Sequence, residues 1–200
     1  MGIEVHYRRL PKSEFERICR DPEQRENFTA PNLPGLDLDE LMKLSGDPQA
    51  MQAKGPEILA AFQRGREDTS RTDLDKEWHA LHFLLTGESS MDTEHRPNDP
   101  LHNVVMGGYE TELVTGYGPA RLLEVDDVSA IAEALGQVSV EDLRRRFSAE
   151  AFNAEEIYPN PRPGGWSEEE IQGVFELYPR LVRFFQDAAK AGEIVVVYAT

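Results

Sequence analysis

The two ends of the chain carry hydrophobic patterns that are typical of β-strands. Ile3, Val5 and Tyr7 alternate with polar residues, and this period of two predicts a half-buried strand. Residues Ile194–Tyr198 are almost all apolar, which indicates a strand that is buried on both faces. We expect the terminal strands to pair in one small sheet with several helices packed against it. The predicted fold class is therefore α+β.

Apolar residues at helical spacing begin near residue 73. They predict a helix that Asp73 caps, that runs to about Thr86 and that ends at a left-handed Gly87. Its apolar face consists of Leu74, Trp78, Leu81 and Leu85. The next apolar run, Leu101–Met106, predicts a short strand or helix before Gly107-Gly108.

The C-terminal half predicts several more helices. Proline within a helix removes a hydrogen bond and crowds the preceding turn, so Pro179 should kink or split the last one. That last helix begins at the cap residue Ser167 and stops at Gly192. The earlier helices are predicted over Asp127–Leu135, after the cap residue Ser139, and over Ser148–Ile157.

The first third of the chain has weaker patterns. Ser13 and Glu16 have the spacing of a capping box, which predicts a helix that ends at Asp21-Pro22. Proline and glycine then interrupt residues 21–72, where we expect only short helices around Asp39–Leu44 and Glu57–Gln63. We therefore predict a single domain over residues 1–200 with an irregular, insertion-like region at about 21–72.

The charge is strongly acidic and is concentrated towards the C-terminus. The net charge is -16; residues 1–73 carry 11 basic and 14 acidic side chains, and residues 74–200 carry 10 and 23. This negative field repels nucleic-acid phosphates and anionic membrane surfaces, so we expect neither as a partner. It attracts a basic protein partner, or it serves only to maintain solubility.

The remaining composition indicates a cytoplasmic protein. Cys19 is the one cysteine, so an intrachain disulfide is impossible and a reducing compartment is expected. Residues 1–10 lack the apolar core of a signal peptide, and no run of 18 apolar residues is present. The glycine-rich segments match no phosphate-binding fingerprint, so we predict no cofactor.

One constellation invites a chemical interpretation. On the helix predicted from Asp73, the side chains of Asp75, His79 and His82 would fall within a sector of roughly 60° beside the apolar face that contains Trp78. Two imidazoles and a carboxylate could form a ligand pocket, an acid–base site or a metal site. The other interpretation is structural, because a histidine that borders a core usually hydrogen-bonds within the fold.

The sequence resembles the YfbM-like family, an uncharacterised bacterial domain family. The most specific part is the pattern Trp-x-x-Leu-His-x-x-Leu-Thr-Gly over Trp78–Gly87, and Asn98–Leu101, Met106–Gly108, Gly116–Arg121 and Glu156–Pro159 support it. The resemblance covers about two-thirds of the chain. It implies a compact α+β domain, and it brings no established activity and no catalytic residue.

Two hypotheses of function remain. The first is an acidic binding or interaction protein, because no complete catalytic motif is found. The alternative is a small-ligand or metal-dependent enzyme with a pocket at Asp75, His79 and His82, in which Trp78 forms a stacking wall. We assign no metal ligand from the sequence, because it does not show whether His6, His95 or His102 approaches the other histidines.

Overall fold

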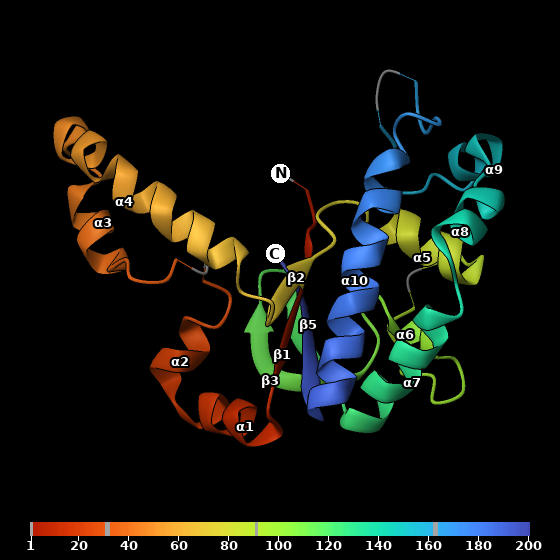
Figure 1. The fold of residues 1–200 in the computed structure, drawn as a ribbon, viewed down its shortest axis with the longest axis horizontal. Coiled ribbons are helices and arrows are strands. Elements are labelled where there is room, and N and C mark those ends of the chain that lie inside the picture. The colour runs from red at the N-terminus through yellow and green to blue at the C-terminus, as the bar shows by residue number, and fades with distance from the viewer. Residues whose placement is uncertain (1, 31–32, 91, 162–163) are drawn as a thin grey trace. The chain divides into compact units, whose positions relative to one another are not determined.

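The structure is a computed structural model that describes residues 2–30, 33–90, 92–161 and 164–200. The chain divides into a larger unit, Met1–Arg25 with Ser70–Thr200, and a smaller unit, Glu26–Thr69 (Figure 1). Within the described residues, every helix is too short or too polar to cross a membrane. That residues 21–72 are an insertion into a single domain stays a prediction.

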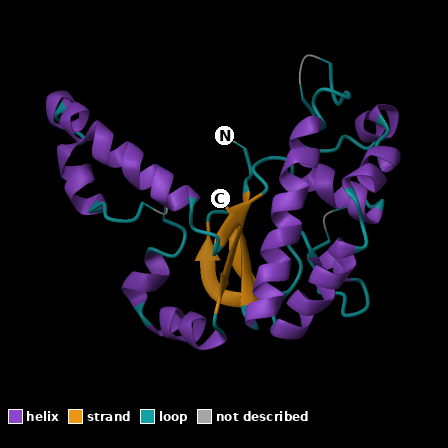
Figure 2. Cartoon of the chain, viewed as in Figure 1, coloured by secondary structure: helices purple, strands orange, loops and turns teal. Residues whose placement is uncertain are grey.

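The larger unit contains a five-stranded antiparallel sheet, drawn in orange in Figure 2, with the strand order β2-β1-β5-β4-β3. The terminal strands β1 (Val5–Leu10) and β5 (Ile194–Ala199) pair over their whole length, with His6 opposite Tyr198. Every residue of β5 is buried. The α+β class, the pairing of the termini and the two-sided burial of the last strand are therefore confirmed.

Three strands of this sheet were not predicted. They are β2 (Arg71–Asp73), β3 (Tyr109–Thr115) and β4 (Gly118–Leu123). The short β2 has no room for a pattern of period two, and Leu113 is the one buried residue of β3. The run Leu101–Met106 contributes the helix α6 (Pro100–Asn103), which Asp99 caps.

Helices α10 (Gln172–Ala191) and α7 (Val125–Gly136) pack on each other and on β5. Figure 1 shows both beside the sheet. Their apolar faces and the inward side chains of β5, Val195 and Val197, form the main core. The remaining helices of this unit are α1 (Lys12–Arg20), α5 (Trp78–Thr86), α8 (Val140–Arg146) and α9 (Ala149–Ala154); α2 (Pro22–Glu26) leads into the smaller unit.

Several predicted helix boundaries are correct and others are wrong. Ser139 and Ser148 cap α8 and α9, and Gly87 and Gly192 are left-handed helix ends. Helix α1, in contrast, begins at Lys12 after Pro11, so Ser13 lies inside its first turn.

The last helix differs from the prediction at its start and at its proline. Ser167 accepts a bond from the amide of Glu170, but the helix begins only at Gln172. Helix α10 continues through Pro179 and is not split. Buried residues on both sides of the proline, such as Tyr178 and Leu181, offset its cost of about 3 kcal/mol.

The smaller unit contains α3 (Leu38–Leu44) and α4 (Pro48–Arg66). The first confirms a predicted helix. The second confirms that Glu57–Gln63 is helical, but the helix has 19 residues and is not short as predicted. The Asp47 carboxylate accepts bonds from two amides and starts the helix at Pro48, well before the predicted segment. Lys54 then joins the two helices through Glu40.

Candidate functional site

The predicted helix from Asp73 begins later than expected. Residues 71–73 form β2, and the amide of Leu74 donates to the carbonyl of Val5 at 2.8 Å. This segment is therefore part of the sheet and not of a helix. Helix α5 begins at Trp78, and Asp75 precedes it with a φ of 47°. The prediction that Asp75, His79 and His82 share one flank of a helix is therefore wrong.

His79 has the contacts of a structural residue. Its Nε2 lies 2.8 Å from the carbonyl oxygen of Ser89, and its Nδ1 accepts a bond from the amide of Tyr158 at 3.0 Å. Trp78 stacks on Tyr158, and its Nε1 donates to the carbonyl of Ile3 at 2.9 Å. Burial lowers the pKa of His79. Both residues tie α5 to neighbouring segments.

His82 has a different environment, which it shares with His102 from α6. The two rings are completely buried, and their centroids lie 5.5 Å apart at an angle of 74°. No described residue gives any of the four ring nitrogens a hydrogen-bond partner. Burial, followed by the nearby His102 and His79, lowers the pKa of His82 to about 4.

Glu88 completes this histidine cluster, which we define as His82, Glu88 and His102. Each residue offers one possible ligand atom, and these atoms all lie within 4.8 Å of one another. The Glu88 Oε2 is 3.6 Å from the His102 Nδ1. Arg96 donates to both carboxylate oxygens of Glu88, at 2.9 and 3.0 Å, and lowers the pKa of Glu88.

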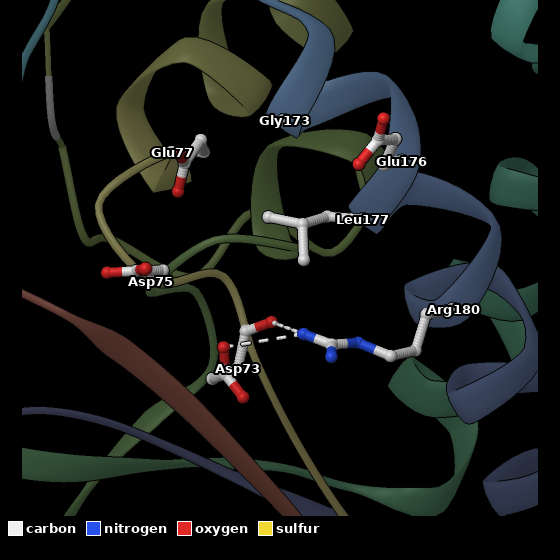
Figure 3. Close-up of a pocket in the computed structure, with 7 residues that line it drawn as sticks. All are labelled: Asp73, Asp75, Glu77, Gly173, Glu176, Leu177 and Arg180. Carbon is white, nitrogen blue, oxygen red and sulfur yellow. Dashed lines mark hydrogen bonds and ion pairs between the residues drawn. The ribbon is translucent and has the colours of Figure 1, made fainter.

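A second site is an open pocket with a volume of about 460 Å³. Four of its lining residues are acidic, and Figure 3 shows them around the apolar side chain of Leu177. We call this the acidic pocket; its lining residues are Asp73, Asp75, Glu77, Gly173, Glu176, Leu177 and Arg180.

The charges of the acidic pocket are unbalanced. Among the described residues that line it, the one cationic residue is Arg180, which contacts Asp73 with an Nη2–Oδ1 distance of 3.3 Å (Figure 3). The Glu77 Oε2 is buried and has no hydrogen-bond partner among the described residues. Burial, and to a lesser degree the carboxylate of Asp75, raise the pKa of Glu77. A cationic group that enters this pocket would meet negative charge on several sides.

The structure separates the residues that the sequence grouped. Asp75 lines the acidic pocket, whereas Trp78, His79 and His82 are not among its lining residues. Glu88 and most of the acidic pocket were not predicted, and His102 was named only as a possible distant ligand whose position the sequence does not give. The spacing of the α10 residues was a signal in the sequence that could have indicated part of the pocket. These residues lie three, four and seven positions after the first of them and therefore share one helix face. They are Gly173, Glu176, Leu177 and Arg180.

These features define an α+β protein in which helices pack on an antiparallel sheet. The sequence profile of the family described as "Domain of unknown function (DUF1877)" matches residues 1–198, and the chain belongs to this family. Protein YfbM of Escherichia coli (strain K12) is 36% identical over 104 residues, which cover 52% of this chain and 58% of YfbM. The predicted resemblance to YfbM-like proteins is confirmed.

A solved structure extends the likeness to nearly the whole chain. The crystal structure of YfbM from Escherichia coli, titled a protein of unknown function, covers 98% of this chain and 99% of its own, with a TM-score of 0.60 and 22% identity. At this identity the likeness shows a shared fold alone. The family and its relative therefore bring no activity to either site.

Proposed function

We propose that the protein is a binding protein whose acidic pocket receives a cationic side chain from a basic protein partner. The observation that carries the proposal is the buried Glu77 Oε2, which no described residue hydrogen-bonds, in a pocket lined by four acidic residues and one arginine. A buried carboxylate oxygen without a partner costs free energy, and a bound ammonium or guanidinium group would recover it.

The size and charge of the pocket support this ligand class. Its volume of about 460 Å³ lies within the range of sites that accept small ligands or single side chains. Leu177 provides apolar contact for the methylene groups of a lysine or arginine, and the carboxylates face its charged end. The net charge of -16 would also accelerate encounters with a basic partner.

The alternative, a small-ligand or metal-dependent enzyme that uses Asp75, His79 and His82, has less support. Both ring nitrogens of His79 are engaged by backbone groups. Asp75 lines a pocket whose lining does not include His82. A cytoplasmic location and the lack of nucleic-acid and membrane partners stay predictions.

The test uses fluorescent tri-lysine and tri-arginine peptides as probes, measured by polarisation with the full chain at low salt. We expect binding that weakens as salt increases. The double substitution Asp75→Asn with Glu77→Gln should reduce affinity about tenfold, since a hydrogen bond between charged groups contributes roughly 1.5 kcal/mol or more. Glu133→Gln, an exposed carboxylate on α7, is the matched control.

The proposal fails if the double variant binds the peptides as tightly as the unmodified protein and the Glu133→Gln control do. Competition by spermidine against the fluorescent peptides distinguishes a site for a free polyamine from a site for a basic protein side chain. If spermidine displaces the peptides at much lower concentration than unlabelled peptide does, the pocket is a site for a free polyamine and the protein partner is wrong.

A further inference from the structure

We propose that His82, Glu88 and His102 bind a divalent transition-metal ion of the zinc class. The three side chains come from the body of α5, the residue after its Gly87 end, and α6. Imidazole nitrogen and carboxylate oxygen are ligands that zinc uses in proteins, and three protein ligands leave one coordination position open. The site shares no residue with the acidic pocket, so the two proposals stand or fall separately.

The burial of the two imidazoles is the first argument. Buried polar side chains are nearly always hydrogen-bonded, and an unpaired one costs about 1–3 kcal/mol. His82 and His102 are both 0% exposed, yet none of their four ring nitrogens has a hydrogen-bond partner among the described residues. A metal ion would engage one nitrogen of each ring. His79, one turn away on the same helix, shows how a structural histidine is satisfied in this fold.

The spacing of the ligand atoms is the second argument. Bonds of about 2.1 Å in a tetrahedron place neighbouring ligand atoms roughly 3.4 Å apart. The His102 Nδ1 and the Glu88 Oε2 are already 3.6 Å apart, and all three ligand atoms lie within 4.8 Å. Small rotations of the side chains would bring the ligand atoms from these distances to the ideal separation. The side chain of Glu88 is 38% exposed, so an ion can enter from solvent on that side.

The electrostatics around Arg96 are the third argument. Its guanidinium holds Glu88 and would compete with a metal ion for that carboxylate. Two other carboxylates lie beside it, that of Asp92 at 3.4 Å and that of Asp99 at 3.9 Å. Arg96 would therefore still have the carboxylates of Asp92 and Asp99 beside it when Glu88 binds the ion. The three carboxylates outweigh the single guanidinium, and this excess of negative charge favours a divalent cation.

The segment that carries Glu88 and Arg96 is held in place at several points. The amide of Arg96 donates to the Asn103 Oδ1 at 3.0 Å, and the Asn103 Nδ2 donates back to the carbonyl of Arg96 at 2.7 Å. Further along, the buried Arg121 donates to the carbonyls of Thr93 and Gly108. A ligand set on such fixed supports loses little conformational entropy when it binds an ion.

The experiment begins with the full chain after removal of metal by a chelator, which is then dialysed away. Zn²⁺ is titrated against a chromophoric competitor, and Co²⁺ is added separately to observe its visible absorption. We expect one ion per chain, a Co²⁺ spectrum of nitrogen and oxygen ligands, and shifts of the His82 and His102 ¹⁵N resonances. Mg²⁺ should not compete, because it prefers oxygen ligands.

Variants assign the ligands. Glu88→Gln and His102→Gln should each weaken Zn²⁺ binding by at least about tenfold, as the loss of even an outer-shell partner commonly does. Arg96→Gln should strengthen it, because the competing guanidinium is gone. The matched controls are Glu94→Gln, an exposed residue of the same segment, and His6→Gln on β1; both should leave the affinity unchanged.

The outcomes are decisive even if His102→Gln does not fold, because Glu88 is partly exposed and its replacement should preserve the structure. The proposal is overturned if the chain does not bind Zn²⁺. It is also overturned if Glu88→Gln binds Zn²⁺ as the unmodified chain does, or if the histidine resonances do not move. It is likewise overturned if the two imidazoles show only proton exchange with water, and this exchange is the same at every Zn²⁺ concentration.

Discussion

The acidic pocket and the histidine cluster draw on the same stretch of chain, Asp73–Glu88, yet they handle polar groups in opposite ways. The pocket is open and is lined by four acidic side chains, of which Glu77 has a buried oxygen with no hydrogen-bond partner in the part of the chain that the structure describes. The cluster contains two completely buried imidazoles. An imidazole can shed its charge and enter the core, whereas a carboxylate at neutral pH retains solvent or a counter-charge. The two regions therefore suit different ligands: an organic cation in the pocket and a metal ion in the cluster.

The largest expected effect that separates the two regions is the response of stability to acid. Without metal, unfolded His82 takes up a proton below its ordinary pKa of 6.5, whereas the folded chain resists protonation until about pH 4. The unfolded state thus binds more protons in this interval. The contribution of His82 to the free energy of unfolding is fully present above pH 6.5 and is lost as the pH falls to about 4. The free energy of unfolding should decrease by on the order of 3 kcal/mol over this interval.

Urea unfolding at a series of pH values, with a chelator present, measures this loss. The groups that face His82 are His102, His79, Glu88 and Arg96, and all of them remain in the variant His82→Leu. That variant should lose less stability between pH 6.5 and 4 than the unmodified protein. The same loss in both proteins would show that His82 does not set the acid response.

The next effect compares the two histidines of α5 directly. His79→Leu removes the partners of the Ser89 carbonyl and the Tyr158 amide, and it should destabilise the fold by about 2 kcal/mol. His82→Leu, measured without metal, should have little effect or increase stability, because it replaces buried nitrogens that no described residue hydrogen-bonds with apolar atoms of similar volume. Thermal and urea unfolding at neutral pH measure both. Equal destabilisation by the two substitutions would contradict the assignment of different roles.

The smallest effect tests the acidic pocket. Burial raises the pKa of Glu77, so its ionised form opposes folding. Glu77→Gln should therefore stabilise the protein at neutral pH, by a few tenths of a kcal/mol. The gain should vanish as the pH approaches about 4, where the native carboxyl group is also neutral. Unfolding curves at both pH values, with Glu133→Gln as the control, measure the difference; a gain that persists in acid would have another cause.

Much of the architecture could be predicted from local patterns. The alternation at Val5 and Tyr7 and the apolar run Ile194–Tyr198 predicted the paired terminal strands. Ser139, Gly87 and Gly192 marked helix ends because capping depends on residues that are neighbours in the chain. Prediction failed where distant pairing competes with local signals. A helix was predicted from the cap residue Asp73, yet Asp73 belongs to the strand Arg71–Asp73 that pairs with β1.

The sequence by itself determined the fold class, the family resemblance and the acidic charge. Only the tertiary structure decided which side chains meet. It placed Asp75 beside Glu176 and Arg180 from α10, and it brought His102 and Glu88 to His82. The physical reason is that hydrophobic periodicity reports which face of an element is buried, whereas the partners across that face depend on how the elements pack.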